Sequence, residues 1–278
     1  MSQLIEGLPD AVAIRCIARV PFYLFPKLEL VSRSWRSAIR SSELYKARQE
    51  VGSTEELLCV CAFEPENSWQ LYDPLRELWI TIPVLPSKIK NLAHFGAVSV
   101  SGKLFVLGGS SDAVDPLTGD QDGSFATSEV WSYDPVIRSW ARRSSMLRGL
   151  STVQVLEGVA ASGWKVEDYG WLQGPMAVVQ GALYVMSHGL ILKQEGKARK
   201  VVVSASEFRK RIGLALTKLG DDIYVIGGVI GPDGWNREIQ PLSDVDVLTV
   251  LGERPTWHRA APMTSCRGTI LGCTQLRI

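Results

Sequence analysis

The sequence predicts a mainly β protein, a β-propeller preceded by a small α-helical domain. Two hydrophobic periodicities and one internal repeat carry this prediction. Between Leu8 and Arg48, apolar residues recur every three to four positions, as on the buried side of a helix. After about Val51, short β-rich runs alternate with tight turns, and a motif of aromatic residues and glycines recurs. We therefore expect a helical domain at residues 1–48 and a β domain at residues 49–278.

The first domain is expected to hold two amphipathic helices. Their apolar stripes are Val12, Cys16 and Val20, followed by Leu28, Val31, Trp35 and Ile39. Pro9 suits the first turn of a helix, because its missing N–H would be unpaired there in any case. Pro21 and Pro26 bracket a break between the helices. A large aromatic residue on such a stripe usually fills a core, so we expect Trp35 to pack inside the domain.

The second domain is expected to consist of antiparallel hairpins. Gly102-Lys103 joins two apolar runs, Gln180-Gly181 joins two more, and Gly220-Asp221-Asp222 separates a third pair. Short strands with regular turns are typical of a sandwich, a barrel or a propeller. The internal repeat decides among these three folds.

The repeat has two parts, a diglycine and an aromatic motif. Its residues are Gly108-Gly109 and Gly227-Gly228 at the ends of similar strands, and Tyr72-Asp73-Pro74 and Tyr133-Asp134-Pro135, each with its Asp six residues before Trp79 or Trp140. A diglycine allows the backbone of one sheet to lie against the next, and a Trp from each repeat fills the space between neighbouring sheets. Both features favour propeller blades.

This order of residues resembles the kelch repeat, which forms one four-stranded blade and has a period of about 50 residues. The resemblance is clearest at 96–147. A weaker unit at 214–263 contains Gly227 and Gly228 and ends with Trp257, at a longer distance from Asp246 than in the other units. The resemblance therefore implies a kelch-type β-propeller.

The N-terminal residues resemble an F-box. The resemblance rests on Leu8-Pro9-Asp10, Cys16 to Pro21, Leu28, Val31-Ser32 and Ser34-Trp35-Arg36. An F-box followed by kelch repeats looks like the plant F-box/kelch-repeat family. The resemblance implies a ligase subunit in which the F-box binds a Skp-type adaptor and a cullin scaffold, and the propeller presents a target protein for ubiquitination. It also implies adaptor-binding roles for Leu8, Pro9, Val12 and Ile17.

One spacing does not fit a complete propeller. Trp140 and Trp164 are only 24 residues apart, about half of one kelch period. We therefore expect that a segment is absent near residues 147–150 and that the ring has about four to five blades, close to the minimum for propellers. The strand-like segment 267–278 is expected to pair with the segment 57–63, because joining the chain ends in one blade removes exposed sheet edges.

The composition favours a folded chain without a general electrostatic partner. Hydrophobic residues make up 46%, charged residues 21%, and the net charge is +1, so we expect no nucleic acid or membrane as partner. We also expect neither a secretory leader nor a membrane-spanning run of about 20 apolar residues. The five cysteines, at positions 16, 59, 61, 266 and 273, lack the spacing of a disulfide framework or a zinc site. Reduced thiols favour a cytoplasmic or nuclear location.

Metal and cofactor chemistry has little support in the sequence. Residues 118–129 place carboxylates as a calcium loop does, but Thr118 stands where the first Asp belongs and β-rich segments flank the loop. A solvated insertion is the favoured interpretation, and we expect no cofactor.

Three non-leading interpretations stay open. The histidines, His94, His188 and His258, show no catalytic or metal-binding spacing, so we expect no enzyme, and a copper-radical-oxidase-like propeller is the enzyme alternative. A kelch scaffold without ligase assembly is the second. The basic segment Lys193 to Arg211 is either a solvated face or a docking patch for an acidic target. Loops 110–128 and 229–243 are the candidate target-facing segments.

Overall fold

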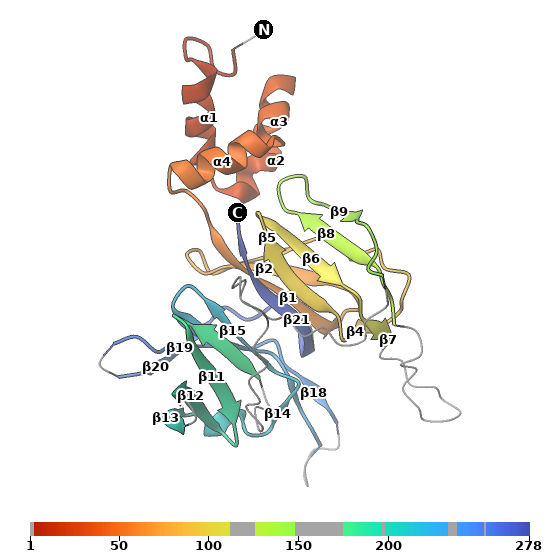
Figure 1. Ribbon diagram of the computed structural model, residues 1–278, viewed down its shortest axis with the longest axis vertical. Helices are drawn as coiled ribbons and strands as arrows, with labels where there is room; N and C mark the ends of the chain where they lie inside the picture. Colours follow the sequence, from red (N-terminus) through yellow and green to blue (C-terminus); the bar gives the residue numbers. More distant parts are fainter. Residues whose placement is uncertain (1–2, 112–125, 148–174, 196–197, 233–237, 253) are drawn as a thin grey trace.

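The computed structural model describes residues 3–111, 126–147, 175–195, 198–232, 238–252 and 254–278. A helical unit lies at one end of a group of antiparallel sheets (Figure 1). The helices of this unit are α1 (Asp10–Ala18), η1 (Phe22–Leu24), α2 (Phe25–Leu28), α3 (Arg33–Ile39) and α4 (Ser42–Glu50). The mainly β class with an N-terminal helical unit is thus confirmed.

The helical unit is more divided than the periodicity predicted. The expected second helix is wrong as one element, because α2 ends at Leu28 and α3 begins only at Arg33. Ser32 lies between them, and its hydroxyl accepts a hydrogen bond from the Trp35 backbone N–H at 3.1 Å, which starts α3. Val31 is therefore in a turn and is exposed, and does not extend an apolar stripe.

Within the described residues, the β part contains four four-stranded antiparallel sheets, which we call blades 1 to 4. Blade 1 has the order β21 (Arg267–Arg277), β1 (Glu56–Glu64), β2 (Trp69–Asp73), β3 (Leu78–Thr81). Blade 2 has the order β5 (Gly96–Val100), β6 (Lys103–Leu107), β8 (Val130–Asp134), β9 (Ser139–Arg142).

Blade 3 has the order β10 (Met176–Val179), β11 (Ala182–Ser187), β12 (Leu190–Glu195), β13 (Ala198–Ser204). Blade 4 has the order β15 (Ala215–Leu219), β16 (Asp222–Ile226), β19 (Val245–Thr249), β20 (Thr256–Ala260), and the short helix η2 (Ser206–Phe208) precedes it. Two small sheets accompany the blades: β4 (Leu92–Ala93) with β7 (Ser110–Ser111), and β14 (Arg211–Ile212), β17 (Val229–Ile230) and β18 (Gln240–Pro241).

The chain ends meet in blade 1, as predicted. Strand β21 pairs antiparallel with β1, in a register that runs from Glu56 opposite Arg277 to Cys61 opposite Gly272. The last strand of the chain therefore forms the first strand of the blade that the start of the β domain builds. The predicted pairing of 267–278 with 57–63 is confirmed.

In the part of the chain that the structure describes, three buried apolar clusters hold the blades together. One joins the helical unit to blades 1 and 2, and includes Ile17, Leu57 and Tyr133. The second joins blades 1 and 4 through Tyr72 and Tyr224, and the third joins blades 3 and 4. The chain passes from blade 2 to blade 3 through residues 148–174, so the predicted deletion and the Trp164 unit lie outside the described residues.

Candidate functional site

Two of the four residues expected to bind the adaptor are exposed. The Pro9 side chain is open to solvent, Val12 is 45% exposed, and Leu8 is half-buried. Ile17 is only 2% exposed and packs in the cluster that joins the helical unit to the blades. The assignment of Ile17 to the adaptor surface is therefore corrected: it lies on the buried side of α1 with Ala13. The expected apolar stripe of the first helix is also wrong, because Val12 and Cys16 are exposed and Val20 lies beyond the end of α1.

Sequence reasoning missed a second exposed apolar pair in the helical unit. Leu30 and Val31 lie in the turn between α2 and α3, and both side chains are mostly exposed. Ser32, as the N-cap of α3, was the signal that could have placed this turn. Trp35, by contrast, packs against the apolar cluster as expected, and its indole N–H donates to the Leu4 carbonyl at 2.6 Å.

The three kelch-motif tryptophans make the same contact in different blades. Each indole N–H donates a hydrogen bond to a backbone carbonyl at the outer edge of an adjacent blade. The pairs are Trp79 with Ala261 at 2.8 Å, Trp140 with Pro83 at 2.6 Å, and Trp257 with Ser204 at 3.3 Å. Trp79 is buried, whereas Trp140 and Trp257 are half-buried. An indole N–H that is shielded from water usually finds such a partner. The motif tryptophans therefore connect blade 1 to 4, blade 2 to 1, and blade 4 to 3.

The Tyr-Asp pairs support these tryptophans. Tyr72 lies opposite Trp79 in the strand register, with ring centroids 4.8 Å apart, and Tyr133 lies opposite Trp140 at 5.2 Å. The neighbouring Asp73 accepts a hydrogen bond from a backbone N–H two residues ahead, at 2.9 Å. Asp134 does the same at 3.0 Å, so each Asp closes the turn that returns the chain to the Trp strand.

In blade 4 the aromatic position is different. Leu248, and not a tyrosine, lies opposite Trp257 in the strand register. Asp246 lies two residues before Leu248 in β19, so it does not occupy the turn position of Asp73 and Asp134. The longer spacing from Asp246 to Trp257 therefore arises because Asp246 lies within strand β19 and not in the turn before the Trp strand.

The diglycines occupy positions where a side chain would collide with backbone. A Cβ on Gly109 would lie 2.7 Å from the Ala93 carbonyl oxygen, and one on Gly227 would lie 2.9 Å from the Gly268 carbonyl oxygen. Both glycines have positive φ, as do Gly108 and Gly228. The second contact brings the end of β16 against β21, so a diglycine of blade 4 allows close approach to blade 1.

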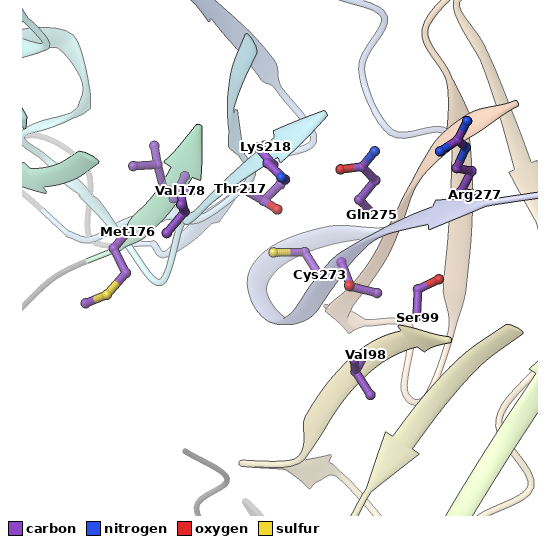
Figure 2. A pocket seen from close by; sticks show the side chains of 12 residues that line it. Val98, Ser99, Met176, Val178, Thr217, Lys218, Cys273, Gln275 and Arg277 are labelled. Atoms are coloured by element: carbon purple, nitrogen blue, oxygen red, sulfur yellow. The ribbon is translucent and has the colours of Figure 1, made fainter. Parts of the chain in front are cut away.

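The inner strands of all four blades line one cavity of about 730 Å³ (Figure 2). Ser99 comes from blade 2, Val178 from blade 3, Lys218 from blade 4, and Gln275 and Arg277 from β21 of blade 1. This convergence is that of the central space of a propeller. The lining mixes apolar side chains with polar and cationic ones.

The described part of the chain holds no group of three or more His, Cys, Asp or Glu residues placed to bind a metal. Burial raises the pKa of the Cys59 and Cys61 thiols far above the ordinary value, which keeps them protonated. Most of the candidate calcium loop, residues 118–125, lies outside the described residues.

The basic segment is less uniform than its composition indicates. Arg211 is largely buried and pairs with Asp246 at 3.2 Å, and its guanidinium lies over the Phe208 ring. Arg199 and Lys200 on β13 are exposed. Of the candidate target-facing loops, residues 112–125 and 233–237 lie outside the described ranges. None of the described helices is long and apolar enough to cross a membrane.

Comparison with known proteins agrees with this architecture. Residues 5–47 match the F-box domain family, and residues 92–147 match the Kelch motif family. The whole chain is 52% identical to the F-box/kelch-repeat protein SKIP30 of Arabidopsis thaliana and covers 98% of it. The F-box/kelch-repeat protein At1g22040 of the same plant is 31% identical over 52% of this chain and 37% of its own length. A solved structure described as "Structure of YjhT" is 14% identical, covers 77% of this chain and 64% of its own, and has a TM-score of 0.28.

The comparison with SKIP30 also bears on the short Trp140 to Trp164 spacing. The alignment extends over 346 positions, 68 more than the 278 residues of this chain, although both chains are covered almost completely. At least that many positions of the alignment thus have no residue in this chain. One kelch period is about 50 residues, so the difference is large enough for a whole blade.

An F-box and kelch repeats together support a substrate-adaptor role in general, and proteins with this combination are typically non-enzymatic. This chain belongs to the F-box/kelch-repeat protein family.

Proposed function

We propose that this chain is the target-recruiting subunit of a ubiquitin ligase of the Skp–cullin–F-box type. The observation that carries the proposal is that Pro9 and Val12 of the F-box are exposed while the opposite side of α1 packs into the propeller core. Exposed apolar residues on a small helical unit are suited to a partner protein. The kelch blades then hold the target at a distance from that partner.

In this role the chain binds and orients, and does no chemistry itself. A Skp-type adaptor on the F-box links the chain to a cullin, which brings a conjugating enzyme loaded with ubiquitin as a thioester. A neutral lysine amine of the target attacks the thioester carbonyl. An amide bond forms, the carbon–sulfur bond breaks, and the proton lost by the nitrogen goes to the leaving sulfur, so that the enzyme's thiol is released. The chain raises the rate by proximity, because it converts an encounter of separate proteins into one within a single assembly.

Further parts of the proposal concern partners and location. We propose a cytoplasmic or nuclear location, where adaptor and cullin are available, and a protein target, with no nucleic acid or membrane as partner. Fluorescence microscopy of the tagged full-length chain tests the location. The alternative function is a kelch scaffold that does not bind the adaptor.

The deciding experiment is co-purification of the full-length chain with a Skp-type adaptor and a cullin. We expect stoichiometric recovery that is lost in the Leu8→Ala, Pro9→Ala double variant. Ile212→Ala, an exposed apolar change on β14, is the matched control and should leave recovery unchanged. A folded wild-type chain that recovers no adaptor would favour the scaffold function.

A further inference from the structure

A buried arginine connects the helical unit to the segment that leads into blade 1. Arg48 of α4 has a side chain that is 2% exposed. One of its terminal nitrogens donates to the carbonyl oxygens of Ala18, the last residue of α1, and of Val20, at 2.9 and 2.7 Å. The other donates to the Glu55 carboxylate at 2.8 Å. The end of α1 and the start of the propeller are thus held by the same guanidinium.

Glu55 is the centre of this contact. Its carboxylate also accepts a hydrogen bond from the Phe22 backbone N–H at 3.0 Å, and it forms an ion pair with Arg76 at 3.2 Å. Its backbone exchanges two hydrogen bonds of 2.9 Å with Ile278, the residue after β21. Glu55 therefore contacts the helical unit, the β2–β3 turn of blade 1 and the C-terminal strand at once.

Arg76 extends the contact to the kelch motif. Its guanidinium pairs with Asp73 at 2.7 Å and lies over the Tyr23 ring of the helical unit, 5.2 Å from the ring centroid. The Asp that closes the Tyr-Asp-Pro turn of blade 1 is therefore tied to the F-box through one side chain.

A second connection lies on a different blade. Glu29 of the helical unit is buried and accepts two hydrogen bonds from Arg40, at 3.1 and 2.8 Å. Arg138, in the β8–β9 turn of blade 2, approaches the same carboxylate to 3.7 Å. Beside it, the β5–β6 turn comes so close to α4 that a Cβ on Gly102 would lie 2.5 Å from the Tyr45 ring.

Two connections on different blades restrain the helical unit more than one does. The apolar cluster already joins the helices to blades 1 and 2. The Glu55 contact lies next to the connecting residues 51–55, about which the helices would rotate as about a hinge, so it opposes that rotation less than a contact farther away does. The Glu29 contact on blade 2 opposes that rotation, because the two contacts lie on separate sheets that share one apolar cluster with the helices. The pair joins a partly exposed arginine to a buried carboxylate at 3.7 Å, and its effect here is on orientation.

We propose that Glu55 and Glu29 are positioning residues that hold the adaptor-binding helices and the propeller in one orientation. The proposal rests on the proposed ligase function in one respect: a fixed orientation limits which lysines of a bound protein meet the loaded conjugating enzyme. The orientation itself is a property of the free chain and can be measured without any partner.

The test measures a distance distribution between two spin labels by double electron–electron resonance in the full-length chain. Cys16 is the exposed cysteine, and Cys59, Cys61 and Cys266 are buried, so Cys16 can be labelled selectively over them once Cys273 has been changed to Ser. A Thr256→Cys change on exposed β20 of blade 4 supplies the second label. We expect one narrow distribution for the otherwise wild-type chain.

The variant is Glu55→Gln with Arg138→Ala, and we expect a distribution at least twice as wide. Replacing Arg138→Ala by Arg138→Lys keeps the charge and should restore part of the lost order. Glu64→Gln, which breaks an exposed ion pair with Arg267 inside blade 1, is the control and should leave the width unchanged. If the double variant does not fold, Arg76→Ala with Arg138→Ala removes partly exposed partners of the same two carboxylates.

The outcomes separate the positioning role from the ligase function. A wide distribution in the wild-type chain, or an unchanged width in both double variants, overturns the positioning role. In the reconstituted ligase, mass spectrometry of ubiquitin attached to the chain's own lysines should find a restricted set that broadens in the double variant while adaptor recovery stays the same. If the wild-type chain binds no adaptor but its distribution is narrow, only the ligase function fails.

Discussion

The indole nitrogen of Trp140 lies 2.6 Å from the carbonyl oxygen of Pro83, and this hydrogen bond joins blade 2 to blade 1. Trp79 and Trp257 make the same kind of bond at two other blade boundaries. A motif defined by residues close together in sequence thus joins neighbouring blades, through bonds whose partners are 53, 57 and 182 residues apart. Loss of one such bond should affect the boundary between two blades.

The Trp140→Phe change should lower the free energy of unfolding by about 1–2 kcal/mol. Phenylalanine keeps most of the apolar area but leaves the Pro83 carbonyl without its donor. Urea denaturation followed by circular dichroism measures the difference. Trp257→Phe, whose bond is longer at 3.3 Å, should cost less, and an equal or larger cost would contradict this ranking.

Truncation after Met263 should destabilise the whole β domain. The change removes β21, which supplies a strand to blade 1 and residues to the clusters that join blade 1 to the helical unit and to blade 4. Hydrogen exchange should therefore rise in blades 1, 2 and 4 together. An increase confined to β1 would show that the strand has only a local role.

Ile17→Ala and Val12→Ala should separate folding from adaptor binding. Ile17 is buried, so its truncation should cost about 2–4 kcal/mol of stability. Val12 is exposed on the same helix, so its truncation should weaken adaptor recovery and change stability by less than about 0.5 kcal/mol. Thermal unfolding and co-purification, measured on both variants, check the two effects. Equal losses of stability would contradict the assignment of the two faces of α1.

Gly102→Ala and Gly181→Ala form a matched pair. Both glycines follow a residue with φ of +48° in a two-residue turn, and their own φ values are +73° and +74°. The backbone penalty of about 1–2 kcal/mol is therefore shared. Only at Gly102 would the new Cβ meet a neighbour, the Tyr45 ring at 2.5 Å. Gly102→Ala should thus lower the free energy of unfolding more than Gly181→Ala does, as measured by urea titration. Equal losses would mean that α4 moves away from the new Cβ without loss of stability.

Stability should fall at alkaline pH. Burial raises the pKa of the Cys273 thiol from its ordinary 9.0 to about 11, and raises those of Cys59 and Cys61 further. Above pH 9 the unfolded chain loses these protons while the folded chain keeps them, so unfolding is favoured as pH rises. For Cys273 alone, two pKa units correspond to about 3 kcal/mol lost between pH 9 and pH 11.

Urea denaturation at pH 8, 9 and 10 measures this loss. The control is Cys273→Ser, which should reduce the fall of stability with pH. The same burial predicts that iodoacetamide at pH 8 modifies Cys16 in the folded chain and all five cysteines in urea. Equal modification of Cys59 and Cys16 without denaturant would contradict it.

Much of the architecture could be predicted from local patterns. The hairpins at Gly102 and Gly181 and the Tyr-Asp turns depend on residues whose conformational preferences are strong. The pairing of the chain ends was predicted from a different argument, the need to cover exposed sheet edges. The prediction of one long second helix was wrong. The apolar spacing continues through the turn between α2 and α3, where Ser32 caps the start of a new helix. Leu30 and Val31 are apolar yet exposed, which periodicity cannot distinguish from burial.

The sequence by itself determined the two-part organisation, the repeat and the blade unit, because these depend on side-chain periodicity and turn geometry within about 50 residues. Only the tertiary structure decided which face of α1 is covered, and therefore that Ile17 is core and Val12 is open. It also decided that Arg48, Glu55 and Arg76 meet at the junction of F-box and propeller. Such contacts depend on which surfaces are brought together when the whole chain packs, and no local pattern encodes that choice.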